Sequence, residues 1–172
     1  LHALSNPALG HRTPGFSAKI KECTAKVKQV YGTENDLFIL TSSGSGAMEA
    51  AVANFINPGD KVIVMENGNF AERWVKINKT YGADVQVIAG EWGQAADPQA
   101  LKAAIDADVN KEIKAVYVTH NETSTGVVHD VKALREAVGD PPAIFVVDSI
   151  SGMAVSPLPV DEWKLDVVVS GS

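Results

Sequence analysis

A run of small and hydroxyl residues, SSGSGAM (residues 42–48), follows the apolar run DLFILT (36–41) and leads directly into a helical pattern. Small side chains let backbone N–H groups approach an anion, and the helix dipole adds ~0.3–1 kcal/mol of attraction for negative charge. The serine hydroxyls offer further donors. We therefore interpret the turn around Ser45, Gly46 and Ala47 as a phosphate-binding site, with an ordinary capped Gly/Ser turn as the alternative.

An aromatic residue, Phe70, closely follows the apolar run KVIVM (61–65) and opens a second helical pattern. One interpretation makes Phe70 the first core residue of an apolar stripe that continues through Trp74 and Ile77. The other places its ring over a flat heteroaromatic ligand, where offset stacking contributes ~0.5–1.5 kcal/mol. The sequence leaves both interpretations open.

The polar loop HNETSTG (120–126) follows the apolar run AVYVT (115–119). The hydroxyls of Thr123, Ser124 and Thr125 could donate to a phenolate-like oxygen, or they could simply cap the loop. A lone imidazole such as His120 is more often a structural hydrogen-bonding group than a general base, and we interpret it so.

An acidic residue, Asp148, ends the apolar run AIFVV (143–147). A carboxylate at the end of a buried strand is costly unless it pairs with a cation or a metal ion. No His or Cys cluster accompanies it, so we expect no metal site. A protonated heterocyclic nitrogen would be a suitable partner, and capping of the following turn is the alternative role.

The segments that carry these residues alternate regularly between strand and helix patterns. The apolar runs predict strands at residues 36–41, 61–65, 84–88, 115–119, 143–147 and 166–169. Helices are predicted at residues 14–31, 46–56, 70–81, 98–106 and 131–138. Most of the runs are continuously apolar, as in strands covered on both faces. The pattern predicts a three-layer α/β/α fold with a mostly parallel sheet, whose ligands bind at the carboxyl ends of the strands.

The first predicted helix has clear ends: Thr13 as N-cap, Pro14 at the first helical position and Gly32 just past the end. Its apolar stripe includes Cys23, which we interpret as a small core residue rather than a reactive thiol.

Composition narrows the class of protein. The chain has 172 residues, 45% of them hydrophobic, with 15 basic and 21 acidic side chains for a net charge of −6. This composition argues against disorder and against a nucleic-acid partner. One cysteine excludes an internal disulfide framework, and no apolar run approaches the ~18 residues that cross a membrane. We expect no membrane partner and a cytoplasmic location, with the peroxisome as an alternative.

A dinucleotide-binding module is an alternative interpretation of the glycine-rich turn. Gly44 and Gly46 match the start of G-x-G-x-x-G, and Glu66 lies 20 residues after Gly46. However, Glu49 occupies the third glycine position, where close packing of helix on strand needs a bare Cα.

Taken together, the strand ends resemble pyridoxal-phosphate enzymes of fold type I, and most closely the class V aminotransferases of the serine/alanine–glyoxylate type. The resemblance covers essentially the whole chain in the family's order. Its blocks are LGHRTPGFS (9–17), TSSGSGAMEA (41–50), ENGNFAERW (66–74), THNETSTG (119–126), VVDSISG (146–152) and VVVSGS (167–172).

The resemblance implies a role for each candidate residue toward pyridoxal 5′-phosphate. Residues 45–47 would bind its phosphate, Phe70 would stack on its ring in place of the family's frequent tryptophan, and Thr123 would bond its phenolic oxygen. Asp148 would pair with the pyridinium nitrogen and Ile150 would pack under the ring. Asp148 would be the catalytic residue, because a protonated ring accepts the electrons of the substrate Cα–H bond.

The resemblance also implies an activity and partners. The activity is amino transfer between a small amino acid, serine or alanine, and a 2-oxo acid such as glyoxylate or pyruvate, in a homodimer. Cysteine desulfuration, another class V chemistry, would usually place a histidine where Phe70 stands. A catalytically inactive binding fragment is a further alternative.

The family's Schiff-base lysine typically follows the final strand as S-G-S-Q-K, whereas this sequence stops at Ser172. We therefore expect residues 1–172 to be part of the large, cofactor-binding domain, ending just before that lysine and without the small C-terminal domain. The activity would then belong to the full-length protein.

Overall fold

A computed structural model describes residues 5–139 and 143–171. Its centre is a sheet with the strand order β2-β1-β3-β6-β7, and every neighbouring pair is parallel. The strands are β1 (Lys61–Glu66), β2 (Asp84–Ala89), β3 (Ile113–Thr119), β6 (Ile144–Asp148) and β7 (Val167–Val169). The predicted parallel sheet is confirmed. Ser172, which ends the last matching block, lies outside the described residues.

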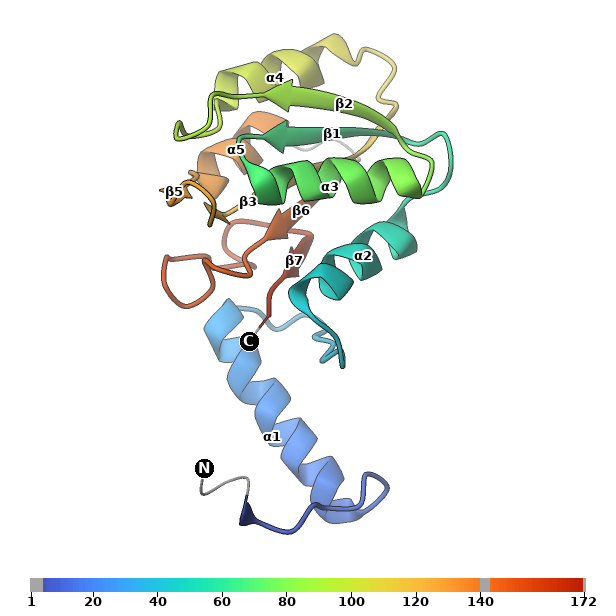
Figure 1. The fold of residues 1–172 in the computed structure, drawn as a ribbon, viewed down its shortest axis with the longest axis vertical. Helices are drawn as coiled ribbons and strands as arrows, with labels where there is room; N and C mark the ends of the chain where they lie inside the picture. Colours follow the sequence, from blue (N-terminus) through green and yellow to red (C-terminus); the bar gives the residue numbers. More distant parts are fainter. Residues whose placement is uncertain (1–4, 140–142, 172) are drawn as a thin grey trace.

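Helices cover both faces of this sheet (Figure 1). They are α2 (Gly44–Phe55) and α3 (Asn69–Thr80) on one face, and α4 (Pro98–Ala107) and α5 (Val131–Val138) on the other. Neighbouring residues of β3 show the two layers: Val116 packs in a core cluster with Leu101 and Leu134, whereas Tyr117 packs in another with Trp74. Successive side chains of a strand point to opposite faces, so the predicted three-layer α/β/α fold is confirmed.

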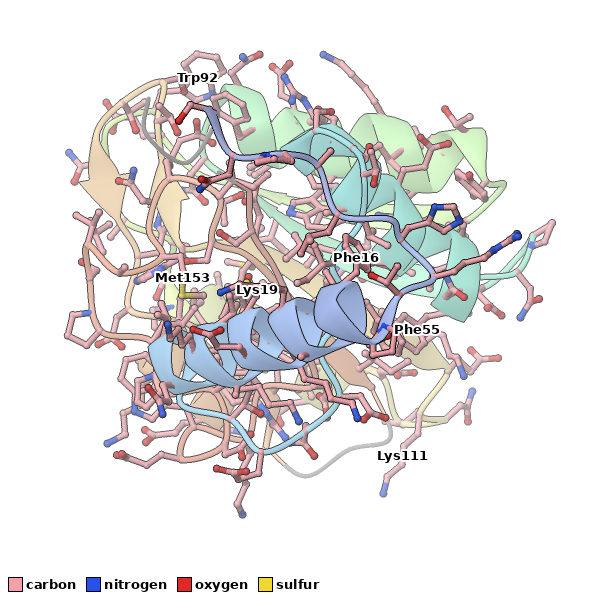
Figure 2. The ribbon with its side chains drawn as sticks, turned by 90° about the horizontal axis from the view of Figure 1, so that it is seen from below. Phe16, Lys19, Phe55, Trp92, Lys111 and Met153 are labelled. Atoms are coloured by element: carbon pink, nitrogen blue, oxygen red, sulfur yellow. The ribbon has the colours of Figure 1, made fainter. Side chains whose placement is uncertain are left out.

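A separate helix, α1 (Pro14–Tyr31), extends away from these layers (Figure 1). Its predicted ends are confirmed, because Thr13 Oγ1 accepts a bond from Phe16 N and Gly32 adopts φ 61°. Seen from below, α1 crosses in front of the layers and carries Phe16 and Lys19 (Figure 2). It has no buried residue.

The interpretation of Cys23 as a core residue is wrong, because its thiol is exposed. Helical spacing places Cys23 on an apolar stripe, but among the described residues of α1 none is buried, and it is Tyr31, at the C-terminal end, that packs against a core cluster. The helix is held to the rest of the chain at its C-terminal end, where Val160 N donates to the carbonyl of Tyr31 at 3.0 Å.

The predicted strand at residues 36–41 does not form. Its apolar side chains are exposed instead: Phe38 by 81%, Ile39 by 57% and Leu40 by 48%. A strand needs a hydrogen-bonding neighbour, and none of the described strands pairs with this segment.

The loop after β3 is more ordered than the sequence predicts. It forms a small antiparallel pair of β4 (Asn121–Glu122) and β5 (Val127–Val128).

The strand order places the candidate residues at the edge of the sheet that is formed by the carboxyl ends of its strands. The chain passes from β1 through α3 to β2 on one side, and it returns through α4 to β3 on the other side of β1. Ligands of such sheets bind outside the carboxyl ends of the strands at this reversal. Phe70, Thr123 and Asp148 belong to the segments that leave β1, β3 and β6 at this edge.

Within the described residues, no helix has the length and apolar character that a membrane span requires.

Candidate functional site

The first turn of α2 carries Ser45, Gly46 and Ala47, all of them half-buried. The amides of Gly46 and Ala47 donate to the carbonyl of Ser43 at 2.9 and 3.2 Å. A Cβ on Gly46 would lie 1.9 Å from Ser42 Oγ and 2.9 Å from Ser42 Cβ, so a larger residue at position 46 would displace the Ser42 side chain. The hydroxyl of Ser45 and the positive end of the α2 dipole therefore provide the anion-binding character of this turn.

Arg73 of α3 contacts the same turn and was missed by the sequence analysis. Its Nη1 donates to Ser45 Oγ at 2.6 Å, and its guanidinium lies 4.8 Å from the centre of the Phe70 ring. Because the Ser45 oxygen accepts from Arg73, its own proton remains available for an acceptor. The signal in the sequence is the i, i+3 spacing of Phe70 and Arg73 in FAERW, which places both on one face of a helix.

Phe70 is half-buried at the start of α3. Phe70 belongs to neither core cluster of the described residues. It is also not among the apolar side chains that pack against these clusters. The apolar stripe of α3 enters the core one turn later, at Trp74, which is 0% exposed. This arrangement favours the interpretation of Phe70 as a stacking ring over that of a first core residue.

Glu122 is the second residue that the sequence analysis missed. Its side chain is 0% exposed, and its carboxylate accepts bonds from the amides of Phe70 and Ala71 and from the amide and hydroxyl of Ser124. The loop after β3 and the start of α3 are thereby joined. Nothing in the residue spacing signals this contact, since Phe70 and Glu122 are 52 positions apart.

The exposed side chain of Thr123 lies beside the loop that follows β6. Its Oγ1 is 2.6 Å from Ser151 Oγ, which also bonds the side-chain amide and the carbonyl of Asn121. The loop that carries Thr123 is therefore hydrogen-bonded to the loop that follows Asp148.

The carboxyl group of Asp148 is buried at the end of β6, with 3% of the residue exposed. Its Oδ1 accepts from the amide of Ile150 at 2.8 Å, so the turn-capping role considered from the sequence is present. Burial raises the pKa of Asp148 from 3.8 to about 6; the Ile150 N–H lowers it, the charge of Glu122 raises it and that of Arg73 lowers it. A nearby cation would offset the cost of burial.

Ile150 connects this carboxylate to α2. A Cβ on Gly44 would lie 2.5 Å from Ile150 Cδ1, so the start of α2 approaches Ile150 closely. The structure thus brings together the start of α2, the start of α3, the loop after β3, and the end of β6 with the loop that follows it. Every sequence-predicted site residue lies on one of these segments.

Two buried histidines lie behind the site. His120 Nδ1 is 2.9 Å from Ser149 Oγ, and His129 Nδ1 accepts from the amide of Ala96. Burial lowers the pKa of both side chains, so both are neutral near pH 7. This agrees with the structural interpretation of His120. Across the described ranges, no group of His, Cys, Asp or Glu could hold a metal ion.

The chain is similar to known proteins over essentially its whole length. The family model described as aminotransferase class-V matches residues 2–172. The chain is 44% identical, over its whole length, to 45% of a protein named soluble hydrogenase 42 kDa subunit from Anabaena cylindrica. It is 39% identical, over 94% of its length, to 41% of a serine–glyoxylate aminotransferase from Methylorubrum extorquens.

A solved structure with the same architecture is ureidoglycine–glyoxylate aminotransferase from Bacillus subtilis. It matches with a TM-score of 0.93 and 31% identity, over 99% of this chain and 43% of that one. The chain therefore spans less than half the length of the proteins that it matches.

Proposed function

The chain belongs to the class-V aminotransferases, and we propose that it forms part of the cofactor-binding large domain of an enzyme that uses pyridoxal 5′-phosphate. The proposed reaction moves an amino group from serine or alanine to a 2-oxo acid such as glyoxylate or pyruvate. Relatives named serine–glyoxylate and L-aspartate–glyoxylate aminotransferase, at 39% and 35% identity, support this choice of substrates.

The observation that carries the proposal is the buried carboxylate of Asp148, at the same edge of the sheet as the start of α2. A Cβ on Gly44, next to Ser45, would lie 2.5 Å from Ile150 Cδ1, and the amide of Ile150 bonds Asp148, so the two ends of the site are close. A phosphorylated pyridine ring has an anion at one end and a basic nitrogen at the other. The side chains of Ser45 and Asp148 fit these two groups.

Each residue has a defined task in this proposal. Asp148 holds a proton at the pyridine nitrogen, and the ion pair returns its own pKa toward the ordinary range. Ser45 and the α2 terminus bind the phosphate, Phe70 and Ile150 hold the two faces of the ring, and Thr123 donates to the phenolic oxygen. When bound, the cofactor supplies the electron sink for cleavage of the substrate Cα–H bond.

A homodimer in the cytoplasm is part of the same proposal. Helix α1 has no buried residue, and its apolar side chains include Ile20 and Val30, which are 41% and 52% exposed. Such a face is suited to contact with a second subunit.

The alternative of a dinucleotide-binding module is not favoured. Glu49, at the third glycine position of that motif, extends its side chain to accept a bond from Tyr81 OH at 2.9 Å. A bare Cα is what the motif needs there, and family membership points to another cofactor.

The test uses the complete protein and its Asp148→Asn variant. We expect the variant to retain the cofactor but to exchange the substrate Cα proton with deuterated water on the order of a hundredfold more slowly. Asp106→Asn, which removes an exposed carboxylate paired with Lys102, serves as the control and should exchange normally. Near-normal exchange by cofactor-loaded Asp148→Asn would contradict the proposal. Absence of cofactor binding by the unmodified protein would leave the inactive-fragment alternative.

A further inference from the structure

The buried carboxylate of Glu122 is surrounded by hydrogen-bond donors. Oε2 accepts from Phe70 N and from Ala71 N, both at 3.1 Å. Oε1 accepts from Ser124 N at 3.1 Å and from Ser124 Oγ at 2.7 Å. A carboxylate offers only acceptors when ionised, and every partner here donates, so the charged form fits these bonds. Across residues 5–139 and 143–171, no salt bridge reaches Glu122.

These bonds provide hydrogen-bond acceptors for the first N–H groups of α3. The first N–H groups of a helix have no partner within it, and the N-cap residue of α3, Gly68, has no side chain to serve them. Glu122 binds the amides of Phe70 and Ala71, and Ser124 Oγ accepts from Asn69 N at 3.2 Å. A negative charge at this end of α3 is also favoured by the helix dipole.

Gly68 leaves room for the Glu122 side chain beside the start of α3. A Cβ on Gly68 would lie 2.4 Å from Glu122 Cγ and 2.5 Å from Glu122 Cδ. Any other residue would therefore push the carboxylate away from the α3 amides. The close approach fixes the loop after β3 against the start of α3.

We propose that Glu122 is a positioning residue that fixes the Phe70 ring relative to the Thr123 hydroxyl. Phe70 is held through its amide, and Thr123 is the next residue in the chain after Glu122. This inference rests on the proposed function, in which those two side chains contact the ring and the phenolic oxygen of the cofactor. Glu122 therefore sets the orientation of the bound ring without touching it.

The negative charge of Glu122 also acts on Asp148, at the other side of the proposed site. The charge of Glu122 raises the pKa of Asp148, so Glu122 adds negative potential where the pyridine nitrogen would lie. A carboxamide at position 122 removes this charge. It also sets an N–H donor against the donors around it.

The test compares Glu122→Gln with Glu72→Gln in the complete protein. Glu72 is the matched control because it lies in the first turn of α3 but has a side chain that is 38% exposed and paired with Lys76. For Glu122→Gln we expect about a tenfold rise in the dissociation constant of pyridoxal 5′-phosphate. We also expect a fall of twofold or more in visible circular dichroism per bound cofactor, which reports how rigidly the ring is oriented. In the apoprotein, the amides of residues 69–71 should exchange hydrogen faster. Glu72→Gln should resemble the unmodified protein in all three measurements.

Faster amide exchange in Glu122→Gln with unchanged affinity and unchanged circular dichroism would overturn the proposal, because Glu122 would then be a helix cap only. If Glu122→Gln fails to fold, Ser124→Ala decides by the same measurements, since it removes one bond to Glu122 and the bond to Asn69. The expected changes are smaller and in the same direction, and their absence overturns the proposal. If the unmodified protein binds no cofactor, the proposed function is wrong and this inference is wrong with it. Amide exchange would still show whether Glu122 caps α3.

Discussion

The carboxyl end of the sheet and the N-terminal region, residues 5–41, are stabilised differently. At the sheet end, side chains bond partners far along the chain: Arg73 reaches Ser45 across 28 positions, and Glu122 reaches Phe70 across 52. In α1, Glu22 pairs with Lys19 and Lys26, three and four positions away. Exposed local pairs of this kind contribute little to stability, because water and salt screen them. Long-range polar bonds therefore fix the candidate site, whereas α1 depends on its contacts at one end.

Two carboxylates show the same difference. Asp148 is buried, which raises its pKa. Asp161 is exposed, and bonds from Thr33, Glu34 and Asn35 lower its pKa. The Asp161 bonds connect the segment after α1 to the rest of the chain at little cost of burial, because Asp161 is exposed. Burial of Asp148 destabilises the protein without a ligand, which is a common property of functional sites.

The largest expected effect is a difference in the free energy of unfolding between a variant in the core under the site and a variant in the N-terminal region. Trp74 is fully buried and packs against Tyr117 with ring centres 4.8 Å apart, whereas Phe38 is 81% exposed. We expect Trp74→Ala to lower the free energy of unfolding by ~3–5 kcal/mol, because it leaves a cavity. Phe38→Ala should change it by less than ~0.5 kcal/mol. Urea denaturation measures both variants, and equal losses would contradict the contrast between the regions.

A smaller effect concerns pH. Burial raises the pKa of Asp148 from its ordinary 3.8 to about 6 in the folded protein, so the folded protein binds more protons than the unfolded chain between these pH values. Stability of the apoprotein should therefore fall as pH rises through that window, by roughly 3 kcal/mol for a shift of this size. Asp148→Asn should lack this fall in urea denaturation between pH 4 and 7. Parallel curves for the variant and the unmodified protein would show that Asp148 is not destabilised by burial.

Asp161 provides the comparison with the opposite sign. Its pKa is lowered, so its contribution is present above the unfolded pKa and is lost as pH falls. Asp161→Asn should therefore remove a stabilising contribution at pH 7 and leave the Asp148 effect in place. A pH profile of Asp161→Asn that matches Asp148→Asn would contradict this assignment.

Local features of the fold could be predicted from the sequence, and the missed features are non-local. Thr13, Pro14 and Gly32 defined the ends of α1 because capping depends on neighbouring residues. The strand expected at residues 36–41 failed because a strand also requires a partner, which one sequence does not reveal. Arg73 and Glu122 were missed for the same reason, since their partners are distant in the chain. Ser45, Phe70, Thr123, Asp148 and Ile150 could be proposed from the sequence because they belong to segments next to predicted strands or helices, and their roles stay predictions.

The central claim is that Asp148 holds a proton at the pyridine nitrogen of a bound pyridoxal 5′-phosphate. The most direct measurement is the ¹⁵N chemical shift of ring-labelled cofactor in the complete protein at neutral pH, compared with Asp148→Ala. We predict a protonated nitrogen in the unmodified protein and an unprotonated one in the variant. An unprotonated nitrogen in the unmodified protein, or the same shift in both, would contradict the account.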